Sequence, residues 1–307
     1  MGIPHWGLKE TNGSGSANIQ KSECESPLGD LYHVRILFVL RTPLELKRFS
    51  GLIARAILYS LIGGMYHDCP FKPLSVAPLY VDGRPVWIGR FDVGTLIQLR
   101  AVVPDTVLAK LFSIGDYVEV EGAKAEVVQA EVEPVRVQAS NPPRRFAVEF
   151  LTPTRFKLRT PQRRAIYTMD VSAPRLADSA ARHALRLPPD VTRQILSRQL
   201  TLEDAKRVVA WTAQYVYSPY VDIKTKAAEG DTGKEIGAVG CVEYERISPK
   251  VSLTAELFWA LVQYGAVVGF GDGKTHGFGH AMVQERCVVE RRKIAFGGTG
   301  AAWTKER

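Results

Sequence analysis

The order of apolar and polar residues predicts a first series of structural elements in the N-terminal half of the chain. Residues 31–41 are rich in Val, Ile, Leu and Phe and are followed by Pro43, which is typical of a strand. Residues 45–62 then place apolar side chains at i, i+3 and i+4, which predicts a helix that stops at Gly63 and Gly64. The elements predicted after this helix are three strand-like segments, a short helix and one or two further strands, at residues 75–81, 86–91, 95–103, 104–112 and 116–138.

A second series of elements follows a proline-rich linker at residues 141–143. Thr201 and Asp204 have the spacing of a capping box at the start of one of its helices. This series repeats the element order of the first, which reads β-α-β-β-α-β. The sequence therefore predicts an α+β chain with two tandem ferredoxin-like domains. The predicted strand, helix, strand, helix and strand of the second series lie at residues 145–151, 202–217, 236–247, 253–266 and 278–289.

Composition sets the expected limits of these domains. Residues 1–29 are polar, contain Gly-Ser-Gly-Ser and lack periodicity, so we expect a disordered leader. We expect the N-terminal domain over residues 30–142. The C-terminal domain is expected over residues 143–296, enlarged by a basic insertion at residues 155–200. Residues 297–307 are expected to form a flexible tail.

The charge of the chain is concentrated in one region. There are 40 Lys and Arg against 32 Asp and Glu, and residues 140–200 alone hold twelve basic and four acidic residues. This imbalance favours a polyanionic partner, with a solvated basic face as the alternative. Between the basic residues, Tyr167 is a candidate for stacking on an unpaired base, while Phe146 and Phe156 are expected in the core. The side chains expected to hold phosphates are Arg144, Arg145, Arg155, Lys157, Arg159, Arg163 and Arg164.

The four cysteines do not suggest a metal site or a disulfide framework. Cys24, Cys69, Cys241 and Cys287 are all more than ten residues apart, so reduced thiols are the expectation. The first residues lack the basic-then-apolar order of a signal peptide. The longest apolar run has about sixteen residues and is too short to span a bilayer. These observations predict a soluble, cytoplasmic protein without a membrane partner.

The most specific string is GFGDGKTHGFGH at residues 269–280, with five glycines. Glycine allows positive φ, and successive N–H groups can then hold phosphate oxygens, although a turn without a ligand remains the alternative. A nucleotide-binding P-loop is excluded, because Val268 occupies the position of its first glycine and a helix, not a strand, precedes the loop. No third ligand accompanies His276 and His280, so no metal or cofactor is expected. The residues of this loop expected to bind are Gly269, Gly271, Gly273, Lys274, Thr275, His276, Gly277 and Gly279.

Three segments resemble the CRISPR-associated endoribonucleases that process repeat RNA, members of the RAMP superfamily. The stretch LVQYGAVVGFGDGKTHGFGH is similar to the C-terminal signature of that family. FAVEFLTPTRFKL at residues 146–158 and HDCPFKPLSVAPLY at residues 67–80 resemble two further family segments. The resemblance implies two ferredoxin-like domains of RAMP type, with a glycine-rich loop between the last helix and the last strand.

The resemblance also implies catalytic residues at Tyr59, His67 and Lys72. In that family the 2′-hydroxyl of the RNA is the nucleophile, so the site must supply proton transfer and positive charge. A histidine transfers protons near neutral pH, a tyrosine positions the hydroxyl, and a lysine stabilises the phosphate. Each residue also has a structural interpretation. His67 complements a helix end, Tyr59 is a half-buried helix residue, and Lys72 is a solvated turn residue.

Three functions remain open on the sequence alone. The first is a metal-independent endoribonuclease that cuts CRISPR repeat RNA once per repeat, leaving a 2′,3′-cyclic phosphate and a 5′-hydroxyl. The second is a non-catalytic RAMP subunit that holds guide RNA. The third is a general RNA-binding protein. The expected partners are repeat RNA, subunits of a CRISPR effector complex and a second copy of the chain.

Overall fold

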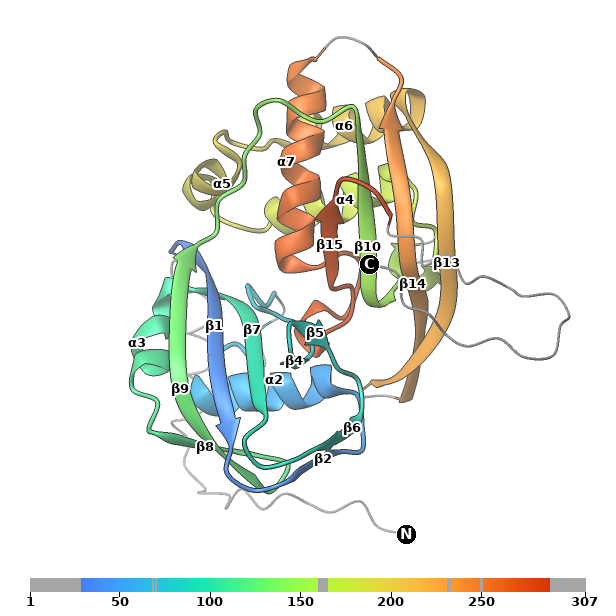
Figure 1. The fold of residues 1–307 in the computed structure, drawn as a ribbon. Coiled ribbons are helices and arrows are strands. Elements are labelled where there is room, and N and C mark those ends of the chain that lie inside the picture. The colour runs from blue at the N-terminus through green and yellow to red at the C-terminus, as the bar shows by residue number, and fades with distance from the viewer. Residues whose placement is uncertain are drawn as a thin grey trace, which may run out of the picture.

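The computed structural model of this chain describes residues 29–67, 69, 71–159, 165–230, 233–248 and 251–287. The predicted tail, and the predicted leader up to residue 28, lie outside the described residues. The chain forms two halves, each with an antiparallel sheet and covering helices (Figure 1). The first half is blue to green in this view and the second is green to red.

The first half is built around β1 (Leu31–Leu40), which lies between β7 (Leu96–Pro104) and β9 (Ala123–Pro134). The sheet order is β5-β4-β7-β1-β9-β8, with β3 also paired to β7. Helix α2 (Ser50–Leu61) covers one face (Figure 1). The remaining elements are β2 (Leu44–Leu46), β3 (Ser75–Val76), β4 (Tyr80–Val81), β5 (Arg84–Pro85), β6 (Gly89–Phe91), η1 (Asp105–Val107), α3 (Leu108–Phe112) and β8 (Tyr117–Val120).

Alternation along β1 explains why it occupies the centre of the sheet. Val34, Ile36 and Phe38 are buried, whereas the residues between them are partly exposed, as the period of two requires for one covered face. The predicted helix at 45–62 begins later than expected. Residues Leu44–Leu46 instead form β2, paired with β6, because Leu-Glu-Leu has the buried-exposed-buried pattern of a strand.

The second half repeats this arrangement. Its sheet order is β13-β14-β10-β15, so the first strand again lies between the third and the last. This is the tandem ferredoxin-like α+β fold that the element order predicted. Helices α4, α6 and α7 cover one face of the sheet (Figure 1). The elements are β10 (Arg145–Thr154), β11 (Phe156–Arg159), β12 (Ala165–Thr168), α4 (Ala173–Ala184), α5 (Pro189–Leu196), α6 (Leu202–Tyr215), β13 (Val216–Gly230), β14 (Gly233–Arg246), α7 (Leu253–Val268), η2 (Lys274–His276) and β15 (Ala281–Gln284).

Two parts of the second half were not predicted as elements. The basic insertion contains the hairpin β11–β12 and the helices α4 and α5. Strand β13 was missed because it is an edge strand with most side chains exposed on both faces, which removes the apolar alternation. The capping box of Thr201 and Asp204 at the start of α6 is confirmed. None of the described helices is long and apolar enough to cross a membrane.

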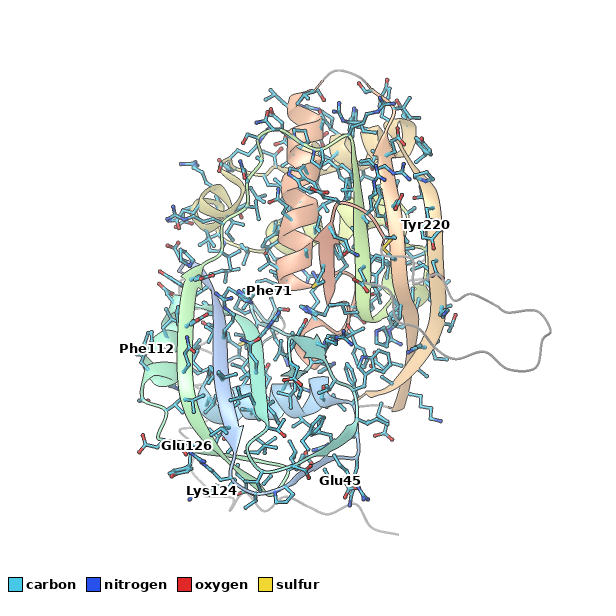
Figure 2. All side chains as sticks on the ribbon, viewed as in Figure 1. Glu45, Phe71, Phe112, Lys124, Glu126 and Tyr220 are labelled. Carbon is cyan, nitrogen blue, oxygen red and sulfur yellow. A yellow bond between two sulfur atoms is a disulfide. The ribbon has the colours of Figure 1, made fainter. Side chains whose placement is uncertain are left out.

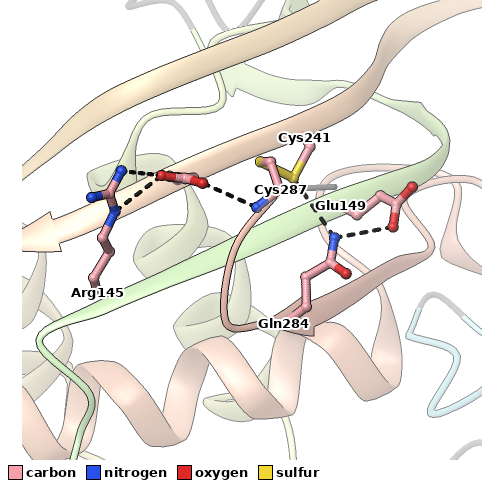
Figure 3. The surroundings of a disulfide bond; sticks show 6 residues. Arg145, Glu149, Cys241, Gln284 and Cys287 are labelled. Carbon is pink, nitrogen blue, oxygen red and sulfur yellow. Dashed lines mark hydrogen bonds and ion pairs between the residues drawn. A yellow bond between two sulfur atoms is a disulfide. The ribbon is translucent and has the colours of Figure 1, made fainter. Parts of the chain in front are cut away.

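The expectation of reduced thiols is wrong. None of the described cysteines is a free thiol, and Cys241 and Cys287 form a disulfide with each other (Figure 3). Strand β10 separates Cys241 on β14 from β15, and the chain after β15 comes back to β14. The Cys287 N–H donates to Glu243 Oε1 at 3.1 Å, and Gln284 Nε2 donates to Glu149 Oε2 at 3.1 Å. Sequence spacing gave no indication of this pair because only the sheet order brings the two residues together.

The disulfide closes a loop of 46 residues and ties the last described segment to the sheet. We expect the double variant Cys241→Ser/Cys287→Ser to lose about 2–4 kcal/mol of unfolding free energy, because the unfolded chain regains the entropy of that loop. The measurement is urea unfolding without reductant. Equal midpoints for the wild type and the double variant would contradict a stabilising role for this bond.

Candidate functional site

The glycine-rich loop joins α7 to β15 and requires its glycines for packing. All five have positive φ, between 72° and 85°. A Cβ at Gly271 would lie 2.1 Å from the carbonyl oxygen of Arg155, and a Cβ at Gly279 would lie 1.8 Å from that of Phe270. At these two positions, therefore, the absence of a side chain allows the protein's own backbone segments to touch.

Most backbone N–H groups of the loop are used inside the protein. Gly271 donates to Ser179 Oγ at 2.8 Å, Asp272 to the Arg155 carbonyl at 2.9 Å and Gly279 to the Pro153 carbonyl at 3.1 Å. The exceptions are consecutive. Within the described part of the chain, the N–H groups of residues 273–275 make no hydrogen bond. Only this central part of the loop has the free donors that the sequence led us to expect.

The loop also joins the two halves, because it packs against the first turn of α2. A Cβ at Gly51 would lie 2.4 Å from the His276 carbonyl oxygen and 2.9 Å from the Cα of Gly277. The rings of Phe49 and Phe278 stack with centroids 5.0 Å apart. The position of the loop is therefore fixed relative to α2.

A polar contact between the halves lies at the end of the loop. The Tyr80 hydroxyl and Nε2 of His280 share a hydrogen bond, and the Arg100 guanidinium lies 3.9 Å from the centroid of the Tyr80 ring. Burial lowers the pKa of His280 to about 4, and the nearby charges of Arg100 and His33 act in the same direction. His280 is therefore neutral at neutral pH. The sequence had presented it only as half of an incomplete metal site.

The other end of α2 holds two of the three residues that the resemblance implies are catalytic. The ring centroids of Tyr59 and His67 lie 5.4 Å apart in an edge-on arrangement. The chain turns back after the helix, since Gly64 N–H donates to the Tyr59 carbonyl at 2.8 Å and His67 N–H to the Gly64 carbonyl at 3.1 Å. Tyr59 is buried and His67 is exposed, so only the imidazole is open to a substrate.

Lys72 lies in a cavity of about 460 Å³ between the two halves, together with the central part of the glycine-rich loop. We call this space the α4 cavity. Figure 2 shows the labelled Phe71, another of its lining residues, where the halves meet. Its lining residues are Phe71, Lys72, Leu74, Phe156, Lys157, Leu158, Arg175, Asp178, Ser179, Arg182, His183, Arg186 and Gly271 to Thr275.

One lysine of the α4 cavity has a buried ammonium group. Lys274 Nζ is buried and makes no hydrogen bond with any described residue. Burial and the charge of Arg186 lower the pKa of Lys274 to about 7, although Asp272 opposes this shift. Burial, Lys274 and Arg186 together hold the pKa of His183 well below its ordinary value. His183 Nδ1 lies 2.7 Å from the Tyr264 hydroxyl, so this histidine is held in place by the core.

The basic residues predicted around β10 do not form one surface. Arg144 pairs with Glu245 at 3.2 Å and Arg145 with Glu243 at 3.0 Å, at the start of the strand. Arg155 lies past the other end, about 30 Å away for a strand of this length. Its guanidinium pairs with Glu235 at 2.7 Å and lies 4.1 Å from the centroid of Tyr167.

Of the remaining predicted basic residues, Lys157 is exposed and lines the α4 cavity. Arg163, Arg164 and the side chain of Arg159 lie outside the described residues. Arg175, Arg182 and Arg186 in the cavity wall were not predicted. Arg175 and Arg182 are seven residues apart on α4 and therefore share one face of that helix, whereas Arg186 lies in the turn that follows it.

Among the residues that the structure describes, no group of three or more His, Cys, Asp or Glu side chains is arranged to hold a metal ion.

Comparison with known proteins gives a family match to one part of the chain and several similar folds. Residues 148–281 match the family model described as CRISPR-associated endoribonuclease Cas6. No curated protein matches the chain by sequence. The fold is similar to that of a Thermus thermophilus Cas6, with a TM-score of 0.58 and 16% identity over 83% of this chain and 98% of that chain. Its product complex gives a TM-score of 0.62 and 16% identity over 82% and 99%. A second Cas6, in complex with a substrate mimic, gives a TM-score of 0.55 and 16% identity over 83% of this chain and 100% of that chain.

The role of close packing in the loop can be tested with two alanine substitutions. Gly271 and Gly64 both have a φ of +75°, but only Gly271 is crowded, since a Cβ at Gly64 would have nothing within 4 Å. We expect Gly64→Ala to cost about 1–2 kcal/mol of unfolding free energy from backbone strain alone. Gly271→Ala should cost clearly more. Urea unfolding measures both, and equal losses would contradict the packing role.

The contact between Tyr80 and His280 predicts a dependence of stability on pH. Unfolded His280 takes up a proton near its ordinary pKa of 6.5, whereas folded His280 does so near 4. Between these values the unfolded state binds more protons, so the unfolding free energy falls as pH falls, by up to about 3 kcal/mol. We expect His280→Gln to lose less stability than wild type between pH 7 and pH 4.5. Parallel stability curves from urea unfolding would contradict this prediction.

Proposed function

We propose that this chain, a Cas6-like protein of RAMP type, is a metal-independent endoribonuclease that cleaves CRISPR repeat RNA once per repeat. The observation that carries the proposal is the exposed imidazole of His67, edge-on to Tyr59, at one end of α2. The other end of the same helix contacts the glycine-rich loop. This loop lies within the segment that matches the Cas6 family model.

The proposed chemistry uses the RNA as its own nucleophile. The 2′ oxygen attacks the adjacent phosphorus and loses its proton, the bond from phosphorus to the 5′ oxygen breaks, and that oxygen gains a proton. The products are a 2′,3′-cyclic phosphate and a 5′-hydroxyl. His67 is the proposed proton-transfer group, because a histidine side chain can transfer protons near neutral pH and this imidazole is open to solvent. No step of this reaction needs a metal ion.

Tyr59 and Lys72 have supporting roles in this proposal. The Tyr59 ring lies against His67 and orients it, and the Arg55 guanidinium lies 5.4 Å from the centroid of the same ring. Lys72 belongs to the α4 cavity and supplies positive charge to the RNA next to the cut. The two Cas6 complexes with product and with a substrate mimic support a role of this fold in RNA processing.

Affinity for RNA is proposed to come from the α4 cavity and the glycine-rich loop. Arg144, Arg145 and Arg155 are already paired with glutamates, so they contribute less than unpaired cations would. Because Lys and Arg contacts to phosphates release counterions, binding should weaken as salt increases. The cut RNA would then pass to subunits of an effector complex, and a second copy of the chain is a further proposed partner.

The test is cleavage of end-labelled repeat RNA, from the CRISPR array of the same genome, in EDTA. We expect wild type to cut at one position and His67→Ala to lose at least ~100-fold in single-turnover rate, which is the usual contribution of a general acid or base. RNA with a 2′-deoxy nucleotide before the cut should resist cleavage, because it lacks the nucleophile.

Two controls separate chemistry from folding and binding. His67 is exposed, so His67→Ala should keep its urea midpoint and its RNA affinity. Lys206→Ala removes an exposed lysine on α6, remote from α2 in sequence, and should cut at the wild-type rate. Binding without cutting by wild type would favour the non-catalytic RAMP subunit. Cutting by His67→Ala at the wild-type rate would refute the proposed role of His67.

A further inference from the structure

The α4 cavity contains a cation that the described protein leaves without a partner. Lys274 lines the cavity, yet its Nζ is buried and makes no hydrogen bond with a described residue. Removing an ammonium group from water costs free energy unless acceptors replace the water. Such a group is retained at a cost to stability, so a ligand that supplies the missing oxygen atoms is the economical explanation.

We propose that the α4 cavity is a binding site for a phosphate group, held by Lys274 together with Arg182 and Arg186. Where the phosphate belongs to RNA, this inference deepens the proposed function and rests on it. A free nucleotide is the other source of the same chemistry.

The charge of the wall selects an anion. Arg182 forms an ion pair with Asp178 at 2.7 Å. The Arg186 guanidinium lies 5.7 Å from the centroid of the Phe71 ring. Six cationic side chains face two carboxylates, so the wall is positive in sum. The cationic side chains are those of Lys72, Lys157, Arg175, Arg182, Arg186 and Lys274, and the carboxylates belong to Asp178 and Asp272.

The backbone adds donors beside the buried lysine. Gly273, Lys274 and Thr275 all line the cavity, and their N–H groups make no hydrogen bond within the described residues. Gly273 has a φ of +80° and begins the short turn. Successive N–H groups in such a turn form a concavity that suits an anion. Two kinds of donor, the buried ammonium and the backbone, therefore belong to the same wall.

The size of the cavity leaves room for more than a phosphate. Its volume of about 460 Å³ lies in the range of small-molecule sites, roughly 300–1,000 Å³. Phe71, from the first half of the chain, contributes an aromatic ring to the wall. A nucleoside attached to the phosphate can therefore enter with it.

The experiment compares wild type with Lys274→Met, which keeps an unbranched side chain of similar length, one atom shorter, and removes its charge. Lys206→Met, on the surface of α6, is the matched control. Thermal unfolding and calorimetry would use inorganic phosphate, adenosine 5′-monophosphate, the dinucleotide ApA and an unstructured RNA of unrelated sequence. For Lys274→Met without ligand we expect a higher Tm, because a buried unpaired cation is gone.

With ligand, we expect wild type and Lys206→Met to bind and to gain Tm. Lys274→Met should bind at least roughly tenfold more weakly, the usual loss for a charged hydrogen bond. Binding of ApA and RNA would identify the source as an internal RNA phosphate. Binding of the monophosphate alone would identify a free nucleotide. The proposal is overturned if no probe binds, or if Lys274→Met binds as tightly as wild type.

The pH dependence of ApA binding gives an independent readout, because its phosphodiester keeps one charge between pH 6 and pH 8. Lys274 has a pKa of about 7 when the cavity is empty, while the pKa of His183 lies well below this range. We expect binding to wild type to be roughly fivefold tighter at pH 6 than at pH 8, and binding to Lys274→Met to be independent of pH. No step of this test depends on cleavage, so a failure of the nuclease proposal would leave it interpretable.

Discussion

The structure depends on one close contact of backbone with backbone, where Gly277 of the glycine-rich loop meets Gly51 in the first turn of α2. A Cβ at Gly277 would lie 2.6 Å from the Cα of Gly51, so any other residue would force the two halves apart. The loop leads from α7 to β15, and α2 leads from the loop to Tyr59 and His67. This contact therefore sets the distance between the region proposed to bind anions and the exposed histidine.

The surrounding contacts make this arrangement rigid. The rings of Phe49 and Phe278 stack beside the glycine pair, and Tyr80 meets His280 at the end of the loop. The first is an apolar contact and the second a buried polar one, which is worth most when both partners stay satisfied. A loop fixed in this way does not need a ligand to become ordered, so its free N–H groups are already in place for binding.

The sequence predicted what depends on local periodicity. β1 and α7 follow patterns that repeat every 2 or 3.6 residues, and the cap of α6 lies within four residues, so all were found. Features that depend on the sheet order were not found. The disulfide of Cys241 and Cys287 is invisible until β10 is placed between β14 and β15.

In the candidate site, too, features of local sequence were predicted and features that depend on the fold were not. The glycine spacing located the loop, and the resemblance to a known family suggested His67, whose role stays a prediction. The fate of individual charges was not predictable, because pairing is decided in three dimensions. Arg145 pairs with Glu243, whereas the Nζ atom of Lys274, in the middle of the glycine-rich loop, is buried. Arg182 and Arg186 reach the cavity only because α4 folds against the loop, and no pattern local to the loop encodes that.

The short connection between α2 and β3 joins the two parts of the proposed site. His67 and Lys72 are five residues apart, so their Cα atoms can be separated by at most about 18 Å. Lys72 lines the α4 cavity, whereas His67 lies against Tyr59 at the end of the helix. In the proposal, a single RNA strand with one phosphate in the cavity presents a neighbouring phosphate to His67, and Lys72 lies beside the cut. If the cavity and His67 have the proposed roles, the fixed length of RNA backbone between them would set the cleavage position. Recognition of the RNA and the choice of the cut then follow from one rigid piece of structure.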